Sequence, residues 1–125
     1  MTYHFKNEHR ITIDEYARRL RVLKFIVFLV SEFYGIKEND ILGRRRTRVI
    51  VDARQIVYFF AYRKFNVPMH IIGEFIGRRG HDTILYGIKK YDFYIRHEDR
   101  IVDVLFKVDK IIFEKMKKDL LLTPK

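Results

Sequence analysis

The residues with the clearest chemical potential are two arginines in a glycine-containing link near the middle of the chain. A short apolar segment (69–76) ends at Gly77, the link Gly-Arg-Arg-Gly follows, and a second segment with apolar residues at helical spacing begins at His81. A short helix, a tight turn and a longer helix are typical of a helix-turn-helix, whose second helix enters a DNA major groove. Arg78 and Arg79 would then lie where N–H groups at a helix N-terminus already favour a phosphate. The spacing alone indicates either this motif or an ordinary helix pair.

A second group of cations precedes this motif. Four guanidiniums occur within the five residues 44–48, at Arg44, Arg45, Arg46 and Arg48. Such a run is often only a solvated loop. Arginine is, however, suited to two-bond contacts with a phosphate and to insertion into a narrow minor groove. An arm beside a helix-turn-helix can contact the minor groove through such arginines. Both interpretations stay open for this run.

The composition favours an anionic partner. The 125 residues carry a formal net charge of +10, more than solubility requires, and 48% of them are hydrophobic. A folded chain of this size is by default one domain, here residues 1–125, and its charge indicates nucleic acid or a membrane surface as the partner. The longest apolar run, residues 25–30, is far too short to span a bilayer. Because the N-terminus also lacks an apolar signal segment, we expect a soluble cytoplasmic protein.

No enzymatic site is expected. The absence of cysteine removes disulfides, thiol catalysis and Cys-based zinc sites. The five histidines show no i, i+4 pairing, so neither a metal site nor catalytic residues are predicted. No segment matches the phosphate-binding pattern G-x-x-x-x-G-K-[ST]. We therefore expect a non-enzymatic protein without a nucleotide or another cofactor.

The apolar periodicity predicts an all-α fold of about six helices. Thr12 and Glu15 form a capping-box pair that starts a long helix, which should end near Gly35. Asp52 is expected to cap a later helix that ends before Pro68. From residue 97 onward another helical stripe should pack against the long N-terminal helix. Residues 1–11 show no period and are expected to form a loose arm.

Three motifs in the middle of the chain carry a family resemblance. They are YGIKENDILGRRRTR at 34–48, Ala-Arg-Gln at 53–55, and Ile-Gly-Glu at 72–74 with the 77–85 stretch ending His-Asp-Thr-Ile-Leu. Through them residues 32–95 resemble the C-terminal DNA-binding domain (domain IV) of the bacterial chromosomal replication initiator DnaA, without its ATPase module. This resemblance implies an all-helical helix-turn-helix domain that binds short sites in double-stranded DNA. The long N-terminal helix and a C-terminal helix are additions to it.

The resemblance also implies roles for particular residues. The family's minor-groove arginine corresponds to Arg46, and its recognition-helix start, Arg-Asp-His-Thr-Thr, corresponds to residues 79–83. Gly80 and Asp82 depart from this pattern, so the usual initiator site is not the expected target. Asp82 either interacts with the helix dipole or accepts a hydrogen bond from cytosine in the groove. The predicted DNA-binding residues are Arg44, Arg45, Arg46, Arg48, Arg54, Gln55, Arg78, Arg79, His81, Asp82, Thr83, Lys89 and Lys90.

The sequence therefore predicts a non-enzymatic, DnaA-like protein that binds specific sites in double-stranded DNA. We expect it to act in replication initiation or its regulation, and to be encoded by a phage or mobile element. Two alternatives remain: a transcriptional repressor, and an interaction module that reuses the fold. In the second alternative, a protein partner or a second copy would dock on the wide apolar surface of the N-terminal helix.

Overall fold

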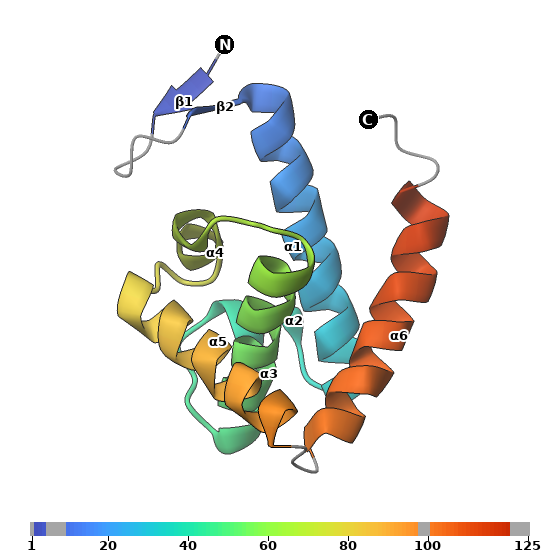
Figure 1. Cartoon of the computed structure of the whole chain (residues 1–125). Helices are drawn as coiled ribbons and strands as arrows, with labels where there is room; N and C mark the ends of the chain where they lie inside the picture. Colours follow the sequence, from blue (N-terminus) through green and yellow to red (C-terminus); the bar gives the residue numbers. More distant parts are fainter. Residues whose placement is uncertain (1, 5–9, 98–100, 121–125) are drawn as a thin grey trace.

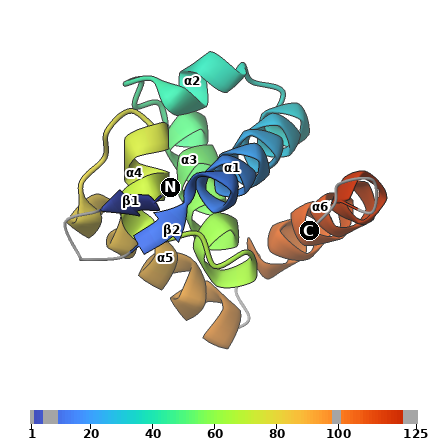
Figure 2. The same ribbon diagram turned by 90° about the horizontal axis from the view of Figure 1, so that it is seen from above.

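The predicted all-α fold is confirmed by the computed structural model, which describes residues 2–4, 10–97 and 101–120 (Figure 1). Its elements are β1 (Thr2–His4), β2 (Arg10–Thr12), α1 (Ile13–Tyr34), α2 (Glu38–Leu42), α3 (Arg48–Phe59), the π-helical turn η1 (Phe60–Lys64), α4 (Met69–Phe75), α5 (His81–Arg96) and α6 (Ile101–Leu120). Viewed from above, α1 and α3 occupy the middle, and α4 and α6 lie on opposite sides of them (Figure 2). The core is built from buried side chains of all six α-helices and η1.

Helix α1 begins and ends where the sequence predicts. The Thr12 hydroxyl accepts a hydrogen bond from the Glu15 N–H at 3.0 Å, which satisfies one of the N–H groups that a helix start leaves unpaired. At the other end Gly35 adopts φ 67°, a left-handed conformation that glycine adopts without steric cost. The second half of α1 is buried on most sides, as its apolar sequence predicts.

Two expectations about local structure were wrong. The described part of the first segment, residues 2–4 and 10–11, is not a loose arm, because β1 pairs antiparallel with β2, with Thr2 opposite Thr12. Residues 1 and 5–9 of that segment lie outside the described residues. This pairing uses backbone donors and acceptors, and a three-residue strand is too short to show a period. Asp52 does not cap a helix either: α3 begins four residues earlier, at Arg48. The earlier start places Ile50 on the buried side of the first turn, and that burial favours a helix there.

The predicted helix-turn-helix is confirmed as α4, a tight turn and α5. The turn uses two successive left-handed residues, Gly77 at φ 65° and Arg78 at φ 57°. It closes when the Arg79 N–H donates to the carbonyl of Gly73 at 2.8 Å. A Cβ at Gly73 would lie 2.3 Å from the Arg79 carbonyl oxygen, so this approach requires glycine.

Helix α5 packs closely against α3, and this contact sets the position of the candidate site. A Cβ at Gly87 would lie 3.0 Å from Tyr58 Cδ2 and 3.1 Å from Gln55 Cγ, so even a methyl group would force these side chains to move. Because the two helices lie so close together, one side of α3 and the first half of α5 form adjacent surfaces next to the α2–α3 loop.

Helix α6 packs against α1, as predicted from its apolar stripe, and buries Leu105, Val108 and Ile112. Its outer side carries two exposed aromatics, Phe106 at 68% and Phe113 at 61%. The predicted lysine-rich end (115, 117 and 118) is described only in part, since the side chains after residue 115 lie outside the described ones. None of the described helices is both long and apolar enough to cross a membrane.

Candidate nucleic-acid interface

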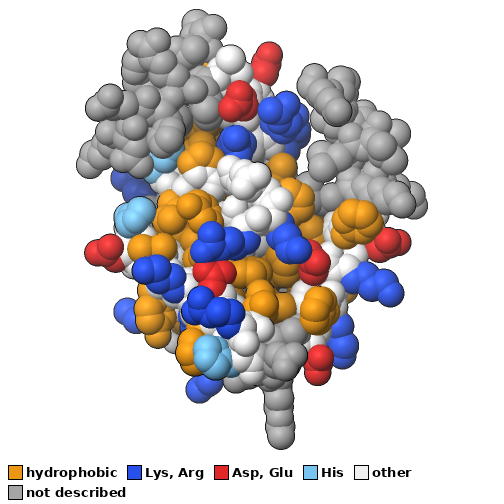
Figure 3. Space-filling view, viewed as in Figure 1, with side chains coloured by type: hydrophobic (Ala, Val, Ile, Leu, Met, Phe, Trp, Pro, Cys, Tyr) orange, Lys and Arg blue, Asp and Glu red, His pale blue; other side chains and the backbone are white. Residues whose placement is uncertain are grey.

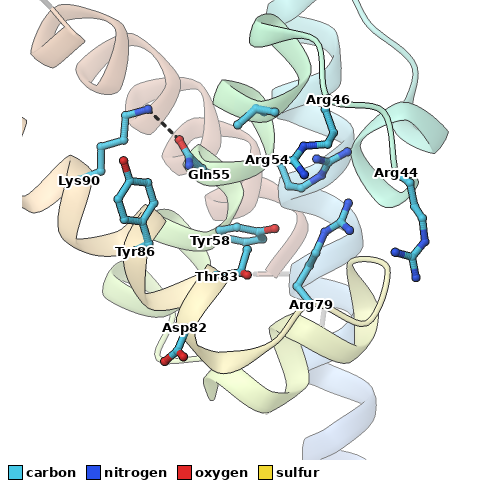
Figure 4. A pocket seen from close by; sticks show the side chains of 11 residues that line it. Arg44, Arg46, Arg54, Gln55, Tyr58, Arg79, Asp82, Thr83, Tyr86 and Lys90 are labelled. Atoms are coloured by element: carbon cyan, nitrogen blue, oxygen red, sulfur yellow. Dashed lines mark hydrogen bonds between the residues drawn. The ribbon is translucent and has the colours of Figure 1, made fainter.

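An open groove of about 770 Å³ lies between the α2–α3 loop, α3 and the first half of α5 (Figure 4). We call the loop residues 43–47 the basic loop and this hollow the basic groove. The residues that line the groove are Arg44, Arg46, Val51, Arg54, Gln55, Tyr58, Arg79, Asp82, Thr83, Tyr86 and Lys90. Three chain segments separated in sequence thus bring their cations to one concave surface.

The basic groove concentrates positive charge. Its lining holds four arginines and one lysine against a single carboxylate, that of Asp82. A concave surface lined by one sign of charge focuses the electrostatic potential and attracts a polyanion. The groove therefore has the charge and shape that bind a phosphate backbone, for which arginine forks are suited.

The arginines of residues 44–48 differ in whether they form ion pairs with acidic side chains of the protein itself. Arg45 lies 4.0 Å from Asp40, and Arg48 lies 3.9 Å from Asp52. Arg44 and Arg46 form no ion pair within the described part of the chain, and both line the basic groove. These two exposed guanidiniums are consequently the most available to an external anion.

Lys90 is held at the far end of the groove by two neighbours. Its Nζ donates to Gln55 Oε1 at 3.0 Å and lies 3.7 Å from an Asp52 carboxylate oxygen (Figure 4). Asp52, which lies inside α3, thus pairs with two cations, Arg48 through one carboxylate oxygen and Lys90 through the other. Lys90 and Gln55, both predicted to bind DNA, are thus hydrogen-bonded to each other in the groove.

Arg54 has a different environment from the other predicted cations. It is only 5% exposed, and its Nε donates to the Ile41 carbonyl at 2.8 Å. Its Nη2 lies 2.9 Å from the Asp40 carbonyl oxygen, 3.1 Å from that of Gly43 and 3.0 Å from that of Arg45, and its two N–H groups are shared among these three acceptors. The structure therefore places Arg54 under the basic loop, bound to its main chain.

Arg79 links the turn of the helix-turn-helix to the same loop. Its guanidinium donates to the Gly43 carbonyl, which also accepts from Arg54. Burial lowers the pKa of Arg54, and the nearby Arg79 lowers it further. Burial raises the pKa of Tyr58, while the positive charges of Arg79 and Arg54 oppose that rise. Arg46, Arg54 and Arg79 therefore form one cluster of guanidiniums (Figure 4).

The start of α5 presents its first turn to solvent. His81, Asp82 and Thr83 are all exposed, but only Asp82 and Thr83 line the basic groove. Asp82 forms no hydrogen bond or ion pair among the described residues, and its carboxylate points away from the guanidinium cluster (Figure 4). The Asp82 carboxylate is thus exposed at the groove and separate from the guanidinium cluster.

Eight of the thirteen predicted residues lie in the groove, and five lie outside it. The five outside are Arg45, Arg48, Arg78, His81 and Lys89, all of them exposed. The prediction missed Val51, Tyr58 and Tyr86, which also line the groove. Tyr86 is 66% exposed. It could have been found from its spacing, since it lies three residues after Thr83 and four before Lys90 on α5.

The face seen in Figure 3 shows a different distribution of charge. Lys and Arg side chains are interspersed there with Asp, Glu and hydrophobic side chains, most clearly over α6. Among the described residues, no three His, Asp or Glu side chains converge as a bound metal ion would require.

Comparison with known proteins agrees with this geometry. A profile of the family described as bacterial dnaA protein helix-turn-helix matches residues 23–90, more than half of the chain. The chromosomal replication initiator protein DnaA of Wolbachia pipientis wMel is 27% identical over 105 residues, which cover 84% of this chain and 21% of that protein. The protein of the same name from Limosilactobacillus fermentum is 29% identical over 101 residues, covering 81% and 21%.

A third relative is more similar over a shorter stretch. The DnaA of Herpetosiphon aurantiacus is 37% identical over 75 residues, which cover 59% of this chain and 16% of that protein. The chain thus spans about a fifth of the length of the relatives it matches. The match of the family profile includes the basic loop, α3, α4, the turn and the first ten residues of α5. On these grounds the chain belongs to the family of the bacterial DnaA helix-turn-helix domain.

Proposed function

We propose that this protein binds specific sites in double-stranded DNA through the basic groove. The observation that carries the proposal is the convergence of Arg44, Arg46, Arg79 and Lys90 beside the exposed start of the second helix of a helix-turn-helix. In this arrangement α5 enters the major groove, and the exposed basic loop reaches the adjacent minor groove with Arg46. The cations bind phosphates and fix the register, whereas the side chains of α5 contact base edges.

Side chains on α5 divide between these two tasks. Asp82 and Thr83 in the first turn are placed for base edges, because that part of a recognition helix reaches the bases. Tyr86, one turn further along, offers an apolar ring to a thymine methyl group or a sugar. His81 and Lys89 on α5, and Arg78 in the turn before it, are exposed outside the groove lining and are suited to flanking phosphates.

We further propose a role in replication initiation or its regulation, exerted on DNA in the cytoplasm. The support is the similarity to proteins named chromosomal replication initiator, which applies to about a fifth of their length. A phage or mobile-element origin remains part of the same hypothesis. A transcriptional repressor would use the same groove, so the arrangement of the bound sites separates the two roles. An array of repeated sites favours replication, and a single palindromic site favours a repressor.

The decisive experiment is a titration of random-sequence duplex DNA at several salt concentrations. Each neutralised phosphate contributes about −0.9 to the slope of log affinity against log salt, so we expect a slope of roughly −4 to −8. Selection of bound sequences from a random duplex pool should then yield a defined site. A slope near zero would contradict the proposal and favour the interaction-module alternative.

A further inference from the structure

The main chain of the basic loop is held from beneath by one side chain of α3. Arg54 donates to the carbonyls of Asp40 and Ile41 at the end of α2, and to those of Gly43 and Arg45 in the loop. All four oxygens therefore lie around one buried guanidinium. The side chains of Arg44 and Arg46, which alternate with these carbonyl contacts, extend toward the groove (Figure 4).

Arginine is chemically suited to this position. The last carbonyls of a helix lack partners within the helix, and at the end of α2 the carbonyls of Asp40 and Ile41 accept from Arg54. A cation at this end of the helix also interacts favourably with its dipole. The planar guanidinium carries five N–H donors in a fixed fork, whereas a lysine ammonium is a compact point charge. Lysine could keep the charge but not the set of directed bonds.

The loop is also held from the side of the helix-turn-helix. Arg79 donates to the Gly43 carbonyl, the oxygen that Arg54 also binds. The turn itself lies close by, since a Cβ at Gly77 would be 2.8 Å from the Leu42 carbonyl oxygen. The basic loop and the start of α5 are thus joined through two arginines and a close backbone contact.

We propose that Arg54 is a positioning residue for DNA recognition, which acts through the basic loop and not as a primary ligand of DNA. Its bonds set the path of residues 43–45 and hence the place of Arg46 relative to α5. Arg79 completes the link, so that the two elements approach two DNA grooves at a fixed separation. This inference rests on the proposed function, because it assigns a task within the same groove.

A wild-type measurement tests the positioning contact without any substitution. The Arg54 Nε–H should exchange slowly with solvent in the free protein, because it donates to a buried carbonyl. Its protection and chemical shift should change little when duplex DNA is added. Fast exchange in the free protein, or a large shift on DNA addition, would overturn the inference in favour of a direct DNA contact.

The second test is a double-mutant cycle between Arg54→Lys and Arg46→Ala. In the wild-type background, Arg46→Ala should weaken binding to the selected site by about tenfold, mostly when its minor groove is A·T-rich. In the Arg54→Lys background the same change should cost less than about threefold, because Arg46 is no longer held in place. Equal costs in both backgrounds would contradict the positioning role.

Arg63→Lys provides a matched control. Arg63 makes a two-bond contact with Asp92, with Nε 3.1 Å from Oδ1, and it does not line the groove. This variant should leave the cost of Arg46→Ala unchanged. Melting temperatures of all variants show whether each is folded. A wild-type salt slope near zero would refute the proposed function and the positioning role together, whereas a slope of the expected size with fast exchange of the Arg54 Nε–H would refute the positioning role alone.

Discussion

The basic groove and the outer side of α6 are both exposed, but they differ in how charge is arranged. The groove lining has five cations and one carboxylate. Among the described side chains of α6 the charges balance, with Lys107, Lys110 and Lys115 against Asp103, Asp109 and Glu114. The net charge of +10 is therefore not spread evenly over the molecule. The location of an excess charge, more than its total, indicates where a polyanion binds.

The two regions also differ in what their exposed aromatics adjoin. Tyr86 lies among the cations of the groove, whereas Phe106 lies beside a second, apolar hollow of about 260 Å³ that Lys64 and Asp109 border. Those two residues pair with each other at 3.5 Å, which leaves no net charge at that border. The apolar surface of α1, on which the interaction-module alternative would dock a partner, is largely covered by α3 and α6. The exposed apolar surface of the described chain is therefore richer on α6 than on α1.

The largest expected effect compares two pairs of charge removals. One double variant combines Arg44→Ala with Arg46→Ala, and the other combines Lys107→Ala with Lys110→Ala. Each removes two positive charges, but only the first pair lies in the groove. Two charge-assisted contacts are worth about 3–6 kcal/mol, and their loss should make the salt slope shallower by about 1.8. The α6 pair should change affinity less than about twofold. Equal effects in a duplex-binding titration would show that net charge alone governs binding.

A stability measurement sharpens the comparison within α6. Leu105 is buried against the core, so Leu105→Ala should lower the free energy of unfolding by about 2–5 kcal/mol. Its exposed neighbour should differ, and Phe106→Ala should change that free energy by less than about 0.5 kcal/mol. Denaturant unfolding at two protein concentrations measures both. A large, concentration-dependent loss for Phe106→Ala would show that a second copy covers this face.

Tyr86 tests whether an exposed aromatic in the groove contributes to DNA binding. Tyr86→Ala should weaken binding to the selected site by about 1–3 kcal/mol, because we propose that its ring contacts a base edge or sugar. Tyr86→Phe should retain most of the affinity if the contact is apolar. Phe93→Ala is the control: Phe93 is also exposed on α5, but it stacks on His97 and lies outside the groove lining. Equal losses for Tyr86→Ala and Phe93→Ala would contradict a specific role for Tyr86.

The smallest expected effect concerns Asp82, the single carboxylate of the groove. Asp82→Thr should raise duplex affinity by about 1 kcal/mol and change the preferred base at one position, because a repulsion with phosphate and an acceptor for cytosine are both removed. A duplex set varied at each position of the site measures this profile. If Asp82 only interacts with the helix dipole, the base profile should stay the same and stability should fall by about 0.3–1 kcal/mol.

Much of the helical framework could be predicted because its signals are local. The Thr12 cap, the left-handed Gly35 and the apolar spacing of α5 each depend on neighbours within about one helical turn. The motifs at 34–48 and 77–85 likewise indicated the family and the helix-turn-helix. The pairing of the two short strands was not predicted, because it depends on a partner strand. The start of α3 was not predicted, because it depends on the burial of the first turn, which no local period reveals.

By itself, the sequence determined most of the helical framework, the excess of positive charge and the resemblance to the family. Only the tertiary structure decided which cations serve which task, because that depends on distances between residues far apart in the chain. It buried Arg54 beneath carbonyls 9 to 14 residues away, and it brought Arg79 to Gly43 across 36 residues. It left Arg44 and Arg46 facing the groove. A guanidinium satisfied by buried carbonyls supports the loop, whereas an exposed one is available to an external anion, and sequence alone does not distinguish the two.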